Sequence, residues 1–496
     1  MNVEERENSY SHILKYTGIF GGVQGLNILV GVIRNKFTAL FLGPSGMGLL
    51  SLFNSTTNFV SSSTNLGIQA SGVKIISDTM PQACHARQAE AVCMVRSFSV
   101  VAALLGLIVC AVLGPLLNFI TFHWGDHTLH FILLSPTVFF TILAGGETAI
   151  LKATRQLKAL AVQASLMALL SLLISVPIYW LWGETGIIGV LFLTAFSQWA
   201  LALRFSSRIA PLRLRINRRV WMRGIPLLRL GIAFMLASMM NSGSEFLIRS
   251  YLNTRGSLET VGLFNAGITI VIIYAGMIFS VMESDYYPRL SAIREKGEAM
   301  NTCVNRQLEM NIMLIGPIII AVIVGLPLII PLLYNDRFLG MLGMTQTAAL
   351  GMLFRALYLP IEYLPLSRGE SKVYLLQESC CVLLLIVCEI AGYRLGEATG
   401  IGSLTALGGG IVVAYAVETV GVLVFSRWHY GYRLSRRGAA AMLFHSLCCL
   451  LALHTAFTSD SAASYWIAGI AIFLISLIYS ARAIRKSLKH SHRSTG

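Results

Sequence analysis

The chain has 496 residues, of which 55% are hydrophobic and only 12% are charged, and its mean hydropathy is +0.70. These values exclude an ordinary soluble domain and a disordered chain, and they indicate a protein that resides in a lipid bilayer. The formal net charge of +15 does not indicate binding to nucleic acid, because the basic residues are dispersed over loops that lie beside anionic lipid headgroups. We therefore expect the lipid bilayer, and no nucleic acid, among its partners.

Apolar stretches long enough to cross about 30 Å of hydrocarbon recur along the whole chain, and we count about fourteen of them. The predicted spans cover residues 14–41, 48–76, 93–120, 129–151, 159–182, 186–205, 226–251, 260–286, 308–334, 345–366, 373–395, 403–426, 440–457 and 464–482. Their apolar runs are unbroken, whereas a lipid-facing strand alternates in polarity. The predicted fold class is an all-α polytopic membrane protein.

The basic residues fall in alternate gaps between these spans. If the N-terminus is cytoplasmic, that side of the membrane receives 31 of the 38 Lys and Arg residues. The positive-inside rule is then satisfied only by an even number of spans with both termini in the cytoplasm.

A weak internal repeat suggests two related halves. The segments Leu52–Ser55 and Leu263–Ala266 begin similarly and are 211 residues apart, and two Glu and Gln pairs elsewhere recur at offsets of 215 and 214. We predict two six-helix lobes, a 6+6 pseudo-repeat around a central cavity, with two extra C-terminal helices. The predicted domains are an N-terminal lobe at 1–205, a basic cytoplasmic linker at 206–225, a C-terminal lobe at 226–430, and the extra helices with a basic cytoplasmic tail at 431–496.

Polar side chains recur at helical spacing in four spans, the first two of each predicted lobe. Polar groups are costly in lipid, so aligned stripes of this kind predict a hydrated cavity. The candidate substrate-binding residues are Gln24, Asn27, Arg34, Asn54, Asn58, Asn65, Asn241, Glu245, Arg249 and Asn265.

Arg34 is the most informative member of these stripes. It precedes Gly43 by nine residues, about 13 Å along a helix, and is therefore too deep to be only an interfacial anchor. It either lines the cavity or pairs with a neighbouring helix. Glu245 and Arg249 are four residues apart and could neutralise each other.

Other charged residues in the spans are candidates for ion coupling or for interhelical salt bridges, and the sequence leaves both open. These residues are Glu147, Glu283, Arg355 and Glu362. The sequence contains no nucleotide-binding, metal-hydrolase or nucleophile motif. We expect a transporter rather than an enzyme, with no cofactor, driven by an H⁺ or Na⁺ gradient, the membrane potential or substrate flow.

The turn FLGPSGMGLL at residues 41–50 resembles the L-G-P-x-G-x-G-L turn of O-antigen and related polysaccharide flippases, and a polar helix follows it. These flippases form the polysaccharide-transporter branch of the multidrug/oligosaccharidyl-lipid/polysaccharide exporter superfamily. The resemblance implies alternating access by two lobes in the bacterial inner membrane. The implied substrate is an undecaprenyl-pyrophosphate-linked oligosaccharide, carried from the cytoplasmic to the periplasmic leaflet. Cavity cations would bind its pyrophosphate, and Arg34 fits this role best, followed by Arg249.

Members of that branch commonly have twelve helices, so the two extra helices keep a fourteen-helix relative, such as a lipid II flippase, open. A cation-coupled multidrug exporter of the same superfamily is the first alternative function. A membrane polymerase or ligase of glycopolymers is the second, although the predicted outer loops are short for it. Other polysaccharide assembly proteins are further candidate partners.

Overall fold

The computed structural model describes the backbone of residues 3–79, 85–122, 127–214, 218–293, 297–459 and 461–494. It describes the side chains of residues 25–79, 87–122, 127–214, 222–272 (apart from 223, 226, 230 and 233), 279, 286–293, 297–459 and 461–486. Every regular element in these ranges is helical, which confirms the predicted all-α class.

Within the described ranges, nine stretches are long and apolar enough to cross a membrane. Two of them, Gly25–Thr64 and Leu157–Ser206, each contain two of the predicted spans. Three further helices, α8 (Arg218–Arg255), α9 (Leu258–Ala292) and α11 (Leu342–Ser367), coincide with the predicted spans at 226–251, 260–286 and 345–366. A polytopic membrane protein is therefore shown, and each predicted span coincides with helix.

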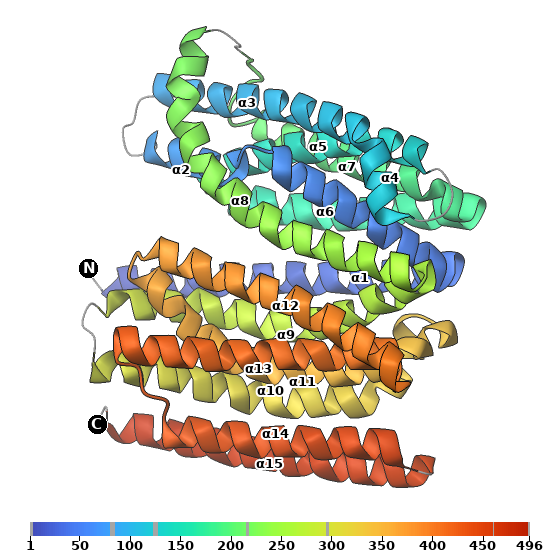
Figure 1. Cartoon of the computed structure of the whole chain (residues 1–496). Coiled ribbons are helices and arrows are strands. Elements are labelled where there is room, and N and C mark those ends of the chain that lie inside the picture. The colour runs from blue at the N-terminus through green and yellow to red at the C-terminus, as the bar shows by residue number, and fades with distance from the viewer. Residues whose placement is uncertain are drawn as a thin grey trace. The chain divides into compact units, whose positions relative to one another are not determined.

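Contacts divide the chain into two compact units, Met1–Gly262 and Leu263–Gly496. The first unit contains α8 together with α1 (Val3–Thr64), α2 (Ile68–Thr79), α3 (His85–Val112), α4 (Gly114–Thr121), α5 (Thr128–Ala153), α6 (Leu157–Trp182) and α7 (Ile187–Ser206). Helix α5 packs between α3 and α7, whereas α1 packs chiefly on α6 and α8 (Figure 1).

Helix α1 is two helices joined at a sharp turn. Gly43 has φ 64° and ψ −174°, which is not helical, and Pro44 begins the second half. Only glycine adopts such a backbone conformation without steric cost, so the turn motif at residues 41–50 explains the position of this break. The two halves of α1 correspond to the predicted spans at 14–41 and 48–76.

Two predicted spans are not single helices, which corrects the prediction. The span at 48–76 breaks between α1 and α2, where Leu66 and Gly67 have φ of 52° and 65°. The Asn65 Oδ1 accepts a hydrogen bond from the Gly67 N–H in this turn. The span at 93–120 breaks at Leu113, directly before α4, which has a proline in its first turn. Hydropathy measures how apolar a segment is and contains no information on its backbone hydrogen bonds, so it does not detect such breaks.

Helix α8 makes close backbone contact with the turn between α1 and α2. A Cβ atom placed on Gly67 in this turn would lie 1.9 Å from the Gly231 carbonyl oxygen, so only glycine fits there. Further along the crossing, the rings of Phe59 and Phe246 stack with centroids 5.3 Å apart. Figure 1 shows α8 running across α1. Although the repeat assigns α8 to the second predicted lobe, its described packing partners belong to the first unit.

The second unit contains α10 (Glu298–Leu333), α11, α12 (Ser371–Thr399), α13 (Ser403–Tyr430), α14 (Arg436–Thr458) and α15 (Ala462–Ser494), with most of α9. Helix α11 packs between α10 and α13, and α12 lies on α13. The two extra C-terminal helices, α14 and α15, pack on α10. The buried His445 of α14 lies between Ser476 and Ser480 of α15, with nitrogen-to-oxygen distances of 3.0 and 3.2 Å. Helices α14 and α15 therefore share a polar contact inside the membrane.

Candidate functional site: polar side chains in the membrane helices

Arg34 lies between α1 and α6. Its Nη1 donates to the Ser171 Oγ at 3.3 Å, and Tyr179 of the same helix interacts with it electrostatically. Its side chain is half-buried. None of the ion pairs in the described part of the chain includes Arg34. Arg34 thus contacts a neighbouring helix, which is one of the two roles that the sequence left open. The serine that it contacts is neutral and does not compensate the charge of the guanidinium.

The remaining polar residues of this stripe have different surroundings. The Thr38 Oγ1 donates to the Arg34 carbonyl oxygen, one turn back. The Asn27 Oδ1 is buried and has no hydrogen-bond partner among the described residues. Gln24 lies in α1, but its side chain is outside the described residues.

A second polar group lies where α1 and α8 cross. Arg249 of α8 donates from Nε to the Ser51 Oγ at 2.9 Å, and its Nη1 lies 3.3 Å from the Glu245 Oε2. The predicted neutralised pair is confirmed, with side-chain exposures of 12% for Arg249 and 58% for Glu245. The candidates Asn54, Asn58 and Asn241 are exposed on the same two helices.

Two candidates lie away from these groups. Asn65 is buried in the turn between α1 and α2, where its side chain binds the backbone, so its position is structural. Asn265 is half-buried on α9 and belongs to the second unit. Their place in substrate binding stays a prediction.

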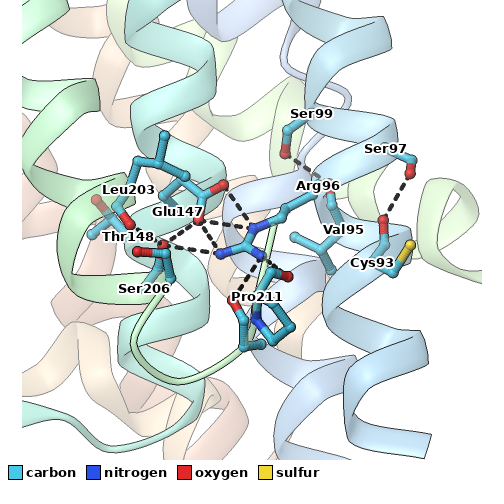
Figure 2. Close-up of polar contacts among 12 residues, drawn as sticks. Cys93, Val95, Arg96, Ser97, Ser99, Glu147, Thr148, Leu203, Ser206 and Pro211 are labelled. Atoms are coloured by element: carbon cyan, nitrogen blue, oxygen red, sulfur yellow. Dashed lines mark hydrogen bonds and ion pairs between the residues drawn. The ribbon is translucent and has the colours of Figure 1, made fainter. Parts of the chain in front are cut away.

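Glu147 forms the most extensive polar cluster of the first unit, shown in Figure 2. Arg96 donates from Nε to the Glu147 Oε1 at 2.9 Å and from Nη2 to the Oε2 at 3.0 Å. The same guanidinium donates to the Ser206 Oγ and to the carbonyl oxygens of Ala210 and Pro211. Of the two roles that the sequence left open for Glu147, the structure provides the interhelical salt bridge. The arginine also ties the segment after α7 to α3 and α5.

The second unit contains a cluster of charged and aromatic side chains around Arg355 of α11. Its guanidinium lies 5.9 Å from the ring centroid of Phe279 and 6.0 Å from that of Tyr415. Glu362 and Glu418, which are 5% and 8% exposed, both interact with it electrostatically. Glu283 lies in α9, with its side chain outside the described residues.

The sequence analysis missed two of these arrangements. Arg96 was assigned to the cytoplasmic basic residues, and its partner is 51 residues away. The polar face of α6 was also missed, although Ser171, Ser175 and Tyr179 recur every four residues in a strongly apolar segment. That spacing was the available signal.

The family described as "Polysaccharide biosynthesis protein" matches residues 38–342, which is more than half of the chain. The chain belongs to this polysaccharide biosynthesis family. No curated protein sequence matches it significantly.

Solved structures show the fold of this family member. The chain is similar to the lipid II flippase MurJ in an inward closed conformation, with a TM-score of 0.73 and 13% identity over 95% of this chain and 99% of that chain. It is also similar to an inward-facing multidrug resistance MATE transporter of the MOP superfamily, with a TM-score of 0.60 and 14% identity over 84% of this chain and 95% of that chain. A MOP superfamily transporter from Pyrococcus furiosus Vc1, with a reported reverse polarity of the binding pocket, gives a TM-score of 0.55 and 15% identity over 83% and 93%. The family match confirms the polysaccharide resemblance inferred from residues 41–50, and the solved structures show the fold that it implied.

The described side chains offer two kinds of chemistry. In the first unit, Arg34 is a cation without a carboxylate partner among the described residues, and its guanidinium can bind an anion through charge-assisted hydrogen bonds. In the second unit, two buried carboxylates interact electrostatically with Arg355, and buried carboxylates can bind a small cation or a proton.

Proposed function

We propose that this protein is a flippase for an undecaprenyl-pyrophosphate-linked oligosaccharide, such as an O-antigen or related repeat unit. It moves the glycolipid from the cytoplasmic to the periplasmic leaflet of the bacterial inner membrane by alternating access. Two six-helix lobes, at 1–205 and 226–430, and cytoplasmic termini are part of this proposal. The family match and the fold shared with MurJ support a lipid-linked substrate.

One observation carries the proposal: Arg34 is a membrane cation that forms no ion pair with the described residues of its own unit. Placing such a charge in a bilayer costs free energy, and charged residues inside membrane helices commonly serve a substrate. A guanidinium binds two phosphate oxygens at once, so a pyrophosphate-linked headgroup is a fitting anion. A purely cationic drug would be repelled by it.

The coupling ion is proposed to bind in the second unit. Glu362 and Glu418 both interact electrostatically with Arg355, and both carboxylates are buried. Two carboxylates near one cation in a low dielectric do not both remain ionised without a further positive charge. H⁺ or Na⁺ would supply it. This cluster also supports the alternative of a cation-coupled exporter of the same superfamily.

Complementation of flippase-deficient bacteria that produce a defined glycan tests the proposal. Arg34→Ala is expected to abolish surface polysaccharide, because the headgroup loses its countercharge. Lys36→Ala is the matched control, since Lys36 is two residues away and points about 160° from Arg34 around the helix. Equal surface polysaccharide from both variants, at equal protein levels, would refute the role of Arg34. Loss of drug resistance with intact polysaccharide would favour the exporter.

A further inference from the structure

Helices α1 and α6 run in the same direction, so a constant offset in sequence number relates residues at the same height along the two helix axes. Arg34 contacts Ser171, 137 residues further along the chain. Just past the ends of the two paired segments, beyond the turn at Gly43 and beyond Trp182, a Cβ on Gly46 would lie 3.0 Å from the Glu184 Oε1, at almost the same separation in sequence. This register places Ser175 at the level of Thr38, and residues 163–165 at the level of Asn27.

The buried face of α6 carries small and polar residues, which membrane helices commonly place where they pack on one another. Its buried residues are Ala161, Gln163, Ser171, Ser175 and Tyr179. The exposed residues of α6 include leucines and tryptophans, which suit contact with lipid. Helix α1 is the main packing partner of α6. The contact between α1 and α6, which we call the α1–α6 seam, is therefore lined by polar groups from both helices.

Several of these groups lack the hydrogen bonds that burial demands. The Ser175 Oγ and Gln163 Oε1 are buried, in side chains that are 3% and 6% exposed, and neither has a partner among the described residues. The Asn27 Oδ1 is in the same condition. Buried polar atoms without partners are costly and uncommon in native proteins. Three of them beside one uncompensated guanidinium indicate that something else completes the seam.

The chemistry of the unpaired atoms defines what would fit. Amide oxygens only accept hydrogen bonds, so a ligand at Asn27 and Gln163 must bring O–H or N–H donors. The guanidinium of Arg34 only donates, so there the ligand must bring acceptors and negative charge. A phosphorylated sugar offers both, with phosphate oxygens at one end and hydroxyl donors at the other. Ser175 lies one turn, about 6 Å, above the level of Ser171, within the reach of a sugar joined to that phosphate.

We propose that the α1–α6 seam is a recognition site for the first sugar of the substrate, in which Arg34 binds the phosphate while Ser175 and Asn27 bind sugar hydroxyls. This inference rests on the proposed flippase function and assigns to α6 the contacts that distinguish a sugar phosphate from a bare phosphate. Gln163 extends the same site toward the level of Asn27.

Calorimetric titration of the full chain in lipid nanodiscs tests the site with two probes, a hexose 1-phosphate and inorganic phosphate. The unsubstituted protein is expected to bind the hexose phosphate more tightly. Ser175→Ala and Asn27→Leu should each weaken hexose phosphate binding by roughly three- to tenfold, the worth of one hydrogen bond, and leave phosphate binding unchanged. Arg34→Gln should weaken the binding of both probes.

Two variants separate lost recognition from damaged structure. Ser165→Ala removes a hydroxyl from the same helix about 120° away from Ser171 and should change nothing. Ser175→Thr keeps a hydroxyl and should retain the preference for the sugar. Equal preference in Ser175→Ala, Asn27→Leu and the unsubstituted protein would overturn the inference, as would the absence of binding of either probe. Neither result decides the flippase proposal, which the Arg34→Ala complementation tests separately.

Discussion

Neutralising Glu147 should destabilise the first unit more than the loss of any surface ion pair. The side chains of Arg96 and Glu147 are only 2% and 7% exposed, and the guanidinium contacts both carboxylate oxygens. In Glu147→Gln, the contacts of Arg96 with Ser206, Ala210 and Pro211 can persist, but all of these partners are neutral. A buried cation without countercharge results. Removing one partner of a buried pair costs about 3–5 kcal/mol.

The structure provides a matched control and a rescue for this prediction. Glu245→Gln also breaks an ion pair with an arginine, but Glu245 is 58% exposed, so solvent screening reduces the expected loss to roughly 0–0.5 kcal/mol. The double replacement Arg96→Met with Glu147→Leu removes both charges and should recover most of the stability lost in Glu147→Gln.

Thermal unfolding in nanodiscs, followed by intrinsic fluorescence, measures the effect. For a unit of this size, 3–5 kcal/mol corresponds to a fall in Tm of roughly 6–15 °C. Glu245→Gln should unfold within about 1 °C of the unsubstituted protein. If Glu147→Gln and Glu245→Gln unfold at the same temperature, Arg96 is solvated and the reasoning from burial is wrong.

Two further variants test packing in each unit. Gly67→Val should prevent the close approach of α8, because a Cβ at this position would lie 1.9 Å from the Gly231 carbonyl oxygen and Gly67 has a positive φ. Size-exclusion chromatography should show a loss of folded protein. A normal elution profile would count against the close crossing. His445→Leu should lower the Tm by several degrees, because it leaves two buried serines of α15 without their partner, whereas the exposed His454 of α14 should tolerate the same replacement.

Much of the fold could be predicted because hydrophobic length is a local property of the sequence. Each apolar stretch of membrane length became helix, and Gly43 with the following proline marked the turn inside α1. The break after Asn65 could not be predicted in this way, since it depends on one side-chain hydrogen bond to Gly67 and not on a change in hydropathy. Local patterns reveal where helices must lie, but they contain little information on where the backbone leaves the helix.

The candidate site was only partly predictable, because pairing depends on contacts between distant residues. The pair Glu245 and Arg249 was foreseen, since four residues separate them on one helix. The partner of Glu147 was missed, because Arg96 lies on another helix and reads as a cytoplasmic basic residue. Periodicity also identified Arg34 without its neighbour, because a pattern within one helix does not show which helix faces it.

The ion-pair partners of three arginines in the membrane helices of the first unit can be compared. Arg96 is buried and fully paired with Glu147, and Arg249 is paired with Glu245 and bound to Ser51. Arg34 has a serine and no carboxylate among the described residues. Within the described part of the first unit, carboxylates therefore stand beside Arg96 and Arg249 and not beside Arg34. A structural role would be served better by a carboxylate on α6, since an unpaired charge is costly in a bilayer. The missing countercharge is most simply explained if the transported molecule brings it.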